Sequence, residues 1–176
     1  MIDKRRPRNK RSKLAAPGST VFLRDHLKRL LSWSDAHADF DTAVAEIPAS
    51  QRGIAPPGLP YSPWQLVEHM RLTQADILAF CERADYKESS WPDDYWPSTP
   101  APPSSQAWDA SIAAYRRDRA ALEQLIVNPS CDLFAKVPAG TGQTFLREFL
   151  LVADHTAYHV GQLIVVRRLL GNWAAA

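Results

Sequence analysis

Three histidines have the types and spacing expected of a metal site. His155 and His159 are four residues apart in a long helical pattern, so their rings project from the same face, one turn apart. His69 lies toward the apolar side of a different expected helix. Three imidazoles that converge inside a helical bundle would bind a divalent ion and leave one coordination position open, which is typical of a reactive site. We therefore predict that His69, His155 and His159 are metal ligands.

The same histidines also have a simpler interpretation. Two histidines four residues apart on a helix are weak evidence for a metal, and a single His69 is most often an ordinary half-buried side chain. However, His155 and His159 lie in a run of core positions, where two imidazoles without partners are costly to bury. A metal ion would satisfy both of them.

Four further side chains are weaker candidates for the same site. His37, beside the apolar stripe of the first expected helix, is a candidate fourth ligand or a neighbour of the ligands. Glu148 lies two turns before the histidine pair, roughly 10 Å along the helix axis, and either accepts a hydrogen bond from the site or pairs with a basic residue. Arg119 is expected to bind an anionic substrate or to pair with Glu148, and Gln162 to orient a ligand or a water. A purely structural role explains each of the four equally well.

Four long helical segments are expected to position these residues. In each of them, apolar residues recur at steps of three and four. Ser62, Pro63 and Gln65 form a capping-box signature, and Gly171 is a typical residue after the end of a helix. The expected segments are Ser19–Ile47, Ser62–Ala84, Ser104–Asn128 and Thr144–Leu170. They predict an all-α fold, a four-helix bundle with long crossover loops.

The last expected helix is apolar on two faces. One stripe carries both histidines of the pair, and the opposite face includes Ala153 and Ala157, which are small enough to permit close approach. Such a helix either lies at the centre of the domain or meets another subunit. We also expect Gly161 to permit close helix packing.

A long loop of Pro, Ser and aromatic residues joins the second and third expected helices. It includes Trp91, Tyr95 and Trp96. Long loops are usually functional or disordered, but three aromatic side chains need a surface to cover. The loop is therefore expected to pack over one end of the bundle, either over the metal pocket or as a wrapped structural connection.

Charge is distributed unevenly along the chain. Residues 1–13 contain seven basic side chains and one acidic side chain, a net charge of +6, while the whole chain carries +2 and the remainder therefore −4. We expect residues 1–18 to form a disordered basic arm, with at most weak attraction for nucleic acid, and residues 19–176 to form one domain.

The composition favours a cytoplasmic location. No run approaches the roughly 20 uninterrupted apolar residues of a membrane span, and no apolar region follows the basic run as in a secretory signal. Cys81 and Cys131 are far apart in the sequence and form no CxxC pair, so a disulfide framework is not expected. Cys81 is expected to be a buried small apolar side chain.

The histidine motifs resemble those of the DinB/YfiT-like superfamily of metal-binding four-helix proteins. The resemblance rests on Ser62-x-Trp64-x-x-x-x-His69 and, more specifically, on His155-x-x-x-His159-x-Gly161-Gln162-Leu163 preceded by Tyr158, and it covers about residues 20–171. It implies three histidine ligands at His69, His155 and His159, zinc or nickel as the ion, and a homodimer. Some members are thiol S-transferases that use bacillithiol or mycothiol, a related branch isomerises maleylpyruvate, and many have no assigned activity.

A three-histidine site with an open position supports two kinds of reaction. The ion can lower the pKa of bound water toward about 7, or it can bind a thiol as thiolate. We therefore predict a metal-dependent enzyme that transfers a small thiol to an electrophilic small-molecule substrate. The alternatives are a hydrolase that uses metal-bound hydroxide and a non-catalytic metal-binding stress-response protein. Without a carboxylate ligand, the site looks less like a facial triad that activates dioxygen.

Overall fold

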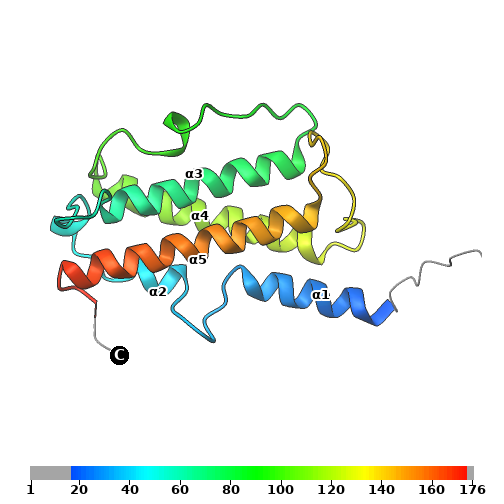
Figure 1. The fold of residues 1–176 in the computed structure, drawn as a ribbon, viewed down its shortest axis with the longest axis horizontal. Coiled ribbons are helices and arrows are strands. Elements are labelled where there is room, and N and C mark those ends of the chain that lie inside the picture. Colours follow the sequence, from blue (N-terminus) through cyan, green and yellow to red (C-terminus); the bar gives the residue numbers. More distant parts are fainter. Residues whose placement is uncertain (1–16, 174–176) are drawn as a thin grey trace, which may run out of the picture.

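The computed structural model describes residues 17–173, and this part of the chain is helical (Figure 1). It contains five α-helices and two short 3-10 helices, and the described residues form no strand beyond one isolated bridge between Lys136 and Thr144. The helices are α1 Pro17–Leu30, α2 Phe40–Val44, α3 Pro63–Glu82, α4 Ser105–Val127 and α5 Phe145–Leu169, with η1 at Ala49–Gln51 and η2 at Asp93–Tyr95. Of the disordered arm predicted over residues 1–18, residues 1–16 lie outside the described residues, and Pro17 and Gly18 belong to α1.

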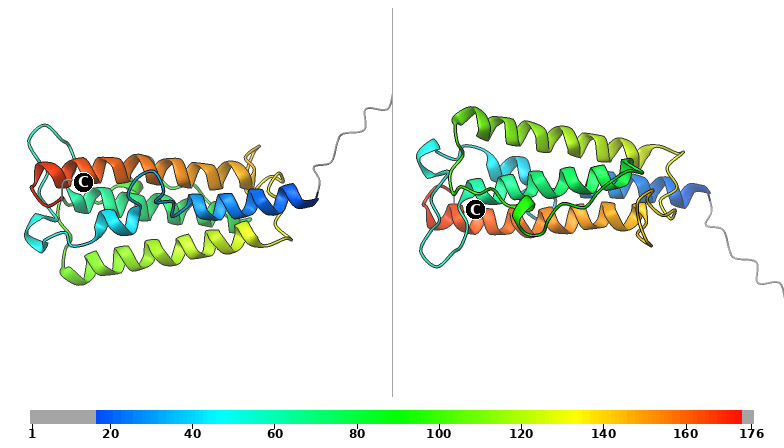
Figure 2. Two further views of the ribbon diagram at one scale, coloured as in Figure 1. Left: turned by 90° about the horizontal axis from the view of Figure 1, so that it is seen from below. Right: turned by 90° about the horizontal axis from the view of Figure 1, so that it is seen from above.

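Three long helices form most of the bundle. Helices α3 and α5 lie antiparallel and side by side, and α4 packs against α3 (Figures 1 and 2). The fourth column consists of α1 and α2, which follow one another between α4 and α5 on the side away from α3. Because α3 and α4 run in the same direction, residues 83–104 return along the length of the bundle (Figure 2). The predicted bundle with a long crossover is therefore found.

The prediction of one unbroken helix over 19–47 is wrong. Helix α1 ends at Leu30, and α2 begins only at Phe40. The segment between them is rich in Ser and Asp, whose side chains bond the nearby backbone and favour caps over helix interiors. Asp39 does this directly, since its carboxylate accepts a hydrogen bond from the Thr42 amide at 2.9 Å and caps α2.

The starts of the three long helices match their sequence signals. Ser62 and Gln65 form the predicted capping box of α3, and Pro63 occupies its first turn. The hydroxyls of Ser104 and Thr144 cap α4 and α5. At the other end of α5, Gly171 has a φ of 72°, the left-handed conformation that glycine adopts without strain. These local signals fix where the site-bearing helices begin and end.

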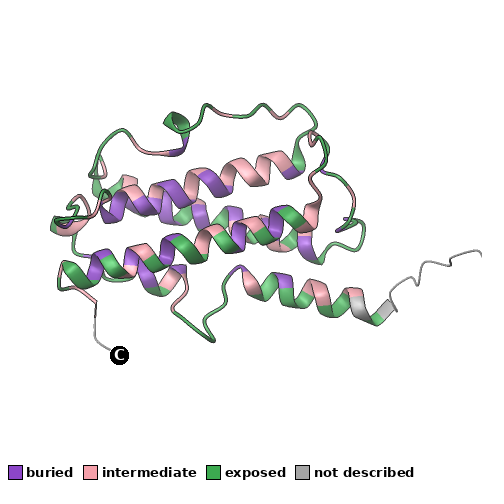
Figure 3. Ribbon diagram, in the orientation of Figure 1, coloured by how far each residue is buried: buried purple, intermediate pink, exposed green. Residues whose placement is uncertain are grey.

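The core consists of two apolar clusters with polar groups between them. One cluster, around Phe40, Trp108 and Leu163, fills one half of the bundle, and the other, around Leu122 and Phe149, fills the second half (Figure 3). The middle turns of α3 and α5 carry buried polar residues instead, namely His69, Thr73, Gln74 and His159. Buried polar groups require partners, so this middle layer is where a ligand or a hydrogen-bond network is expected.

Helix α5 is buried unevenly around its axis. It is long and apolar enough to cross a membrane by length and composition alone, a test that the core helix of a bundle also passes. Its inner face packs against α3 and α2, while Leu150, Ala157 and Val165 are exposed. The prediction that Gly161 permits close packing is wrong, because a Cβ added there meets no atom within 4 Å.

Candidate metal centre

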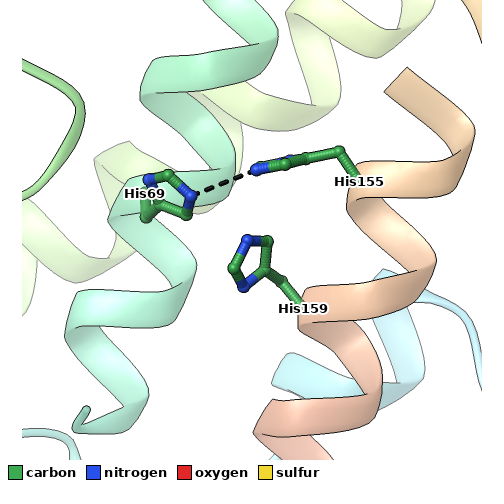
Figure 4. Close-up of side chains that lie close together, drawn as sticks. All are labelled: His69, His155 and His159. Carbon is green, nitrogen blue, oxygen red and sulfur yellow. Dashed lines mark hydrogen bonds between the residues drawn. The ribbon is translucent and has the colours of Figure 1, made fainter. Parts of the chain in front are cut away.

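The three predicted histidines converge in the middle of the bundle. His69 projects from α3 toward His155 and His159 on α5 (Figure 4). One ligand nitrogen from each ring lies within 4.8 Å of the other two. The Nε2 atoms of His69 and His155 are 3.1 Å apart. The expected convergence is therefore present, and metal binding by these residues stays a prediction.

Each imidazole is oriented through its other ring nitrogen. Nδ1 of His69 lies 2.7 Å from the Tyr95 carbonyl oxygen, and Nδ1 of His159 lies 2.7 Å from Oε1 of Gln162. Both oxygens can only accept, so both rings carry their proton on Nδ1. Outer partners of this kind fix the tautomer and the ring orientation of histidine ligands.

The third imidazole has a weaker partner of the same kind. Nδ1 of His155 lies 3.4 Å from the Thr73 hydroxyl oxygen. That hydroxyl donates its single proton to the His69 carbonyl at 2.8 Å, so it accepts from His155. All three rings then direct the lone pair of Nε2 toward the centre of the cluster.

The spacing of the nitrogens fits a bound cation. Two Nε2 lone pairs that face each other at 3.1 Å repel unless a cation lies between them. Zinc bonds to imidazole nitrogen at about 2.0–2.1 Å, so tetrahedral geometry separates two such nitrogens by about 3.3–3.4 Å. For the pair of His69 and His155 the two values agree to within a few tenths of an ångström, and the third nitrogen lies within 4.8 Å of both, so the donor set fits a divalent ion after a small adjustment of the rings.

Burial keeps the three rings neutral. Desolvation is the main cause that lowers the pKa of His69 to about 4, against the opposing hydrogen bond to the Tyr95 carbonyl, and the pKa of His155 to about 3, with a smaller contribution to each from the neighbouring imidazoles. Desolvation also lowers the pKa of His159, although its hydrogen bond to Gln162 acts in the opposite direction. Metal ions bind the neutral form of imidazole, so the cluster is ready to bind at neutral pH without first losing protons.

The aromatic loop covers the histidine cluster in the middle of the bundle, and the prediction that it packs over one end is wrong. Trp96 stacks on His69 with ring centroids 3.8 Å apart, and Tyr61 stacks on the other face of Trp96 at 4.3 Å. The preceding residue, Tyr95, supplies the carbonyl that orients His69. The crossover is thus part of the site, and it shields one face of the His69 ring from water.

The weaker candidates are placed differently from one another. Gln162 contacts the cluster directly through His159. His37 is exposed in the break between α1 and α2 and is not brought to the cluster. Arg119 binds Asp41 at 2.7 Å, not the carboxylate of Glu148, so the predicted pairing of Arg119 with Glu148 is wrong.

Glu148 lies in a separate polar cavity farther along the groove between α3 and α5. Its carboxylate is buried and accepts a hydrogen bond from Arg147 at 2.8 Å. Opposite it on α3, Asp76 accepts a hydrogen bond from the Tyr86 hydroxyl at 2.9 Å. These groups line a cavity of about 420 Å³. The alternative in which Glu148 pairs with a basic residue is the one observed.

Sequence reasoning missed three residues of the site. Thr73 follows His69 by four residues, so the helical pattern contained a signal for it. Tyr95 and Trp96 contact His69 across 26 and 27 residues of sequence, and only the loop's aromatic content hinted at them. Cys81 is not a candidate for a reactive thiolate, because burial raises the pKa of its thiol to about 12.

Comparison with protein families places these motifs in a known group. A family model described as the DinB superfamily matches residues 32–163, which is most of the chain and includes all three histidines of the cluster. Comparisons with curated proteins and with solved structures found no significant match.

Proposed function

This chain belongs to the DinB superfamily, and from its three-histidine cluster we propose that it is a metal-dependent enzyme that transfers a small thiol to an electrophilic substrate. The observation that carries the proposal is the inward arrangement of three neutral imidazoles, each with Nδ1 held by an outer partner. Zinc and nickel are the ions proposed, because both accept imidazole nitrogen. The thiol is proposed to be a free low-molecular-weight thiol.

The chemistry needed for thiol transfer follows from the charge of the site. A divalent ion held by three neutral ligands keeps its full charge, which lowers the pKa of a thiol or water that binds beside them. In the reaction, the thiol sulfur forms a bond to the electrophilic carbon, the leaving group departs with the bonding electron pair, and the thiol proton goes to solvent. His69, His155 and His159 would hold the ion, and Gln162 would keep His159 in the required tautomer.

The residues around the cluster would also exclude water. Trp96 covers one face of His69, and the apolar cores of the bundle lie on both sides along the helices. Electrostatic interactions are stronger in a site from which water is excluded. This environment favours attack by a thiol over attack by water, which is the reason for preferring transfer to hydrolysis.

A direct assay tests the proposal. Protein reconstituted with zinc or nickel is mixed with a small thiol and monochlorobimane, and the fluorescent thioether is followed with time. We expect saturable turnover that His155→Ala abolishes and that His37→Ala, which alters an exposed histidine outside the cluster, leaves unchanged. Undiminished turnover in His155→Ala would contradict the role of the cluster.

Two alternatives give different results in the same samples. A metal-dependent hydrolase would turn over a nitrophenyl ester in the absence of thiol. A non-catalytic metal-binding protein of a stress response would bind the ion and turn over neither substrate. The comparison of wild type, His155→Ala and metal-free protein separates these cases.

The proposal includes a homodimer and a cytoplasmic location. Exposed apolar residues of α5, among them Leu150 and Ala157, line a hollow of about 600 Å³ together with Trp33, and a second copy would cover this surface. Sedimentation of wild type beside Leu150→Asp tests the dimer, since a monomeric wild type would refute it.

Cys81 and Cys131 are both free thiols, which supports the proposed cytoplasmic location, because the cytoplasm is a reducing compartment.

A further inference from the structure

A small apolar pocket lies beside the histidine cluster, on the side of the groove away from Glu148. It has a volume of about 250 Å³ and is formed between the segment that precedes α3 and the C-terminal half of α5. Its walls include Leu59, Tyr61, Leu66, Gln162, Val165 and Val166. No lining residue is ionisable at neutral pH, so a charged group would lose its hydration there without gaining a partner.

The pocket adjoins the cluster through both helices. Leu66 precedes His69 by three residues on α3, and Gln162 follows His159 by three residues on α5, so the pocket begins about one helical turn, or roughly 5 Å, from two of the imidazoles. Gln162 provides the polar edge of the pocket and bonds to His159 at 2.7 Å. Tyr61, another wall residue, stacks on the same Trp96 ring that covers His69.

The size of the pocket limits what it can hold. Pockets that enclose whole drug-sized ligands measure roughly 300–1,000 Å³, so this one accommodates part of a ligand. A cavity of about 150 Å³ is enough for benzene. An aromatic ring with a short substituent, or a short branched alkyl group, therefore fits, whereas a helix or a protein loop does not.

We propose that this pocket binds the hydrocarbon part of a small amphiphilic substrate, with the polar reacting end of that substrate directed along the groove toward the three histidines. The apolar walls supply the affinity for the ring or alkyl group, and Gln162 marks the boundary between the apolar and polar parts. The orientation toward the histidines rests on the proposed function, whereas the binding of the hydrocarbon group does not.

The first test uses metal-free protein and the probe 4-fluorobenzyl alcohol, followed by ¹⁹F NMR. We expect saturable binding that Val165→Asp weakens at least tenfold, because it places a carboxylate in the apolar wall. Leu169→Asp is the matched control, since it makes the same change one turn farther along α5 at a residue outside the pocket. Both side chains are substantially exposed, at 46% and 60%, so both variants are expected to fold. Absence of binding to wild type, or equal loss in both variants, would overturn the proposal.

A second readout locates the probe without any substitution. In methyl-labelled wild-type protein, we expect nuclear Overhauser effects from the probe ring to the methyl groups of Val165 and Val166 and none to those of Leu169. Effects confined to methyl groups of residues outside the pocket walls would place the ring elsewhere and overturn the assignment.

The orientation is tested on cobalt-substituted protein with two thiols. Benzyl mercaptan is expected to bind at least tenfold more tightly than 2-mercaptoethanol, as followed by the thiolate-to-cobalt absorption band, and Val165→Asp is expected to remove this preference. Equal binding of the two thiols by wild type would overturn the orientation. Failure of the protein to bind cobalt would contradict the proposed function. The measurements on metal-free protein would still show whether the pocket binds a hydrocarbon group.

Discussion

The two ends of the groove between α3 and α5 have opposite chemistry. On one side of the histidines, Leu66 and Val166 contribute to an apolar pocket of about 250 Å³. On the other side, Asp76 and Glu148 line a polar cavity of about 420 Å³. The same pair of antiparallel helices forms both walls. The side chains one or two helical turns from the three histidines therefore determine what each end of the groove can bind.

The comparison shows how the charged end is stabilised and why the apolar end is the better ligand site. The buried carboxylate of Glu148 accepts a hydrogen bond from Arg147, and the half-buried carboxylate of Asp76 accepts one from Tyr86, so both acidic groups of the polar cavity have partners within the protein. The apolar pocket has no such internal partners, and burying a hydrocarbon group there costs no desolvation of charge. The cluster of three imidazoles separates these two environments.

The largest expected effect on metal affinity concerns the cluster of three histidines between the two ends. His159→Ala should weaken zinc binding by at least about 100-fold, because it removes one of three nitrogen donors, and even outer partners of metal ligands change affinity by 10- to 100-fold. Competition with a chromophoric chelator measures the affinity. His37→Ala is the control and should match wild type, and equal affinities of all three proteins would place the metal elsewhere.

The next effect is the dependence of metal-free stability on pH. Between about pH 6.5 and 4, unfolded histidines bind protons, whereas the buried His69 and the half-buried His155, with pKa values of about 4 and 3, remain neutral. The unfolded state then binds more protons, so the free energy of unfolding falls as pH falls through this window, by at most about 1.4 kcal/mol per pH unit for each histidine. Urea unfolding of wild type and His155→Ala checks this, and an equal slope in both would refute it.

A smaller effect on stability is expected at the polar cavity, where Arg147 pairs with Glu148. Arg147→Ala should lower the free energy of unfolding by about 2 kcal/mol, because it leaves the carboxylate of Glu148, whose side chain is 2% exposed, without its ion-pair partner. Glu148→Leu removes the charge itself and should cost less. Urea unfolding measures both, and zinc affinity should be unchanged in both. If Arg147→Ala has the same free energy of unfolding as wild type, the carboxylate of Glu148 must have another hydrogen-bond partner.

The smallest of the four effects concerns the boundary between the cluster and the apolar pocket. Gln162→Leu should weaken zinc binding about tenfold, because it removes the acceptor that holds the Nδ1 proton of His159. Gln162→Glu keeps an acceptor at that position and should retain the affinity of wild type. Titration calorimetry distinguishes them, and identical affinities would mean that Gln162 does not orient the ligand.

Local signals in the sequence predicted the three longest helices and the shared face of His155 and His159. The capping box at Ser62 fixed the start of α3, and the spacing of His155 and His159 placed both rings on one face of α5. These predictions succeed because the partners lie within four residues of each other. The role of Gln162 was accessible for the same reason, since it lies one turn from His159.

Contacts between distant segments were not predictable in this way. Apolar periodicity continued through Trp33, so it did not reveal the break between α1 and α2, which depends on Ser and Asp side chains bonding the backbone. The sequence indicated Glu148 or an anionic substrate as the partner of Arg119, and only the packing of α2 against the bundle brings Asp41 to it. The stacking of Trp96 on His69 likewise depends on the path of the crossover.

X-ray absorption spectroscopy on protein reconstituted with one equivalent of zinc tests the central claim most directly. The account predicts one ion per chain with three imidazole nitrogens at about 2.0–2.1 Å and a fourth light-atom ligand. In His155→Ala, the imidazole count should fall to two. A shell without imidazole, or a protein that takes up no zinc, would contradict the assignment of His69, His155 and His159 as a metal site.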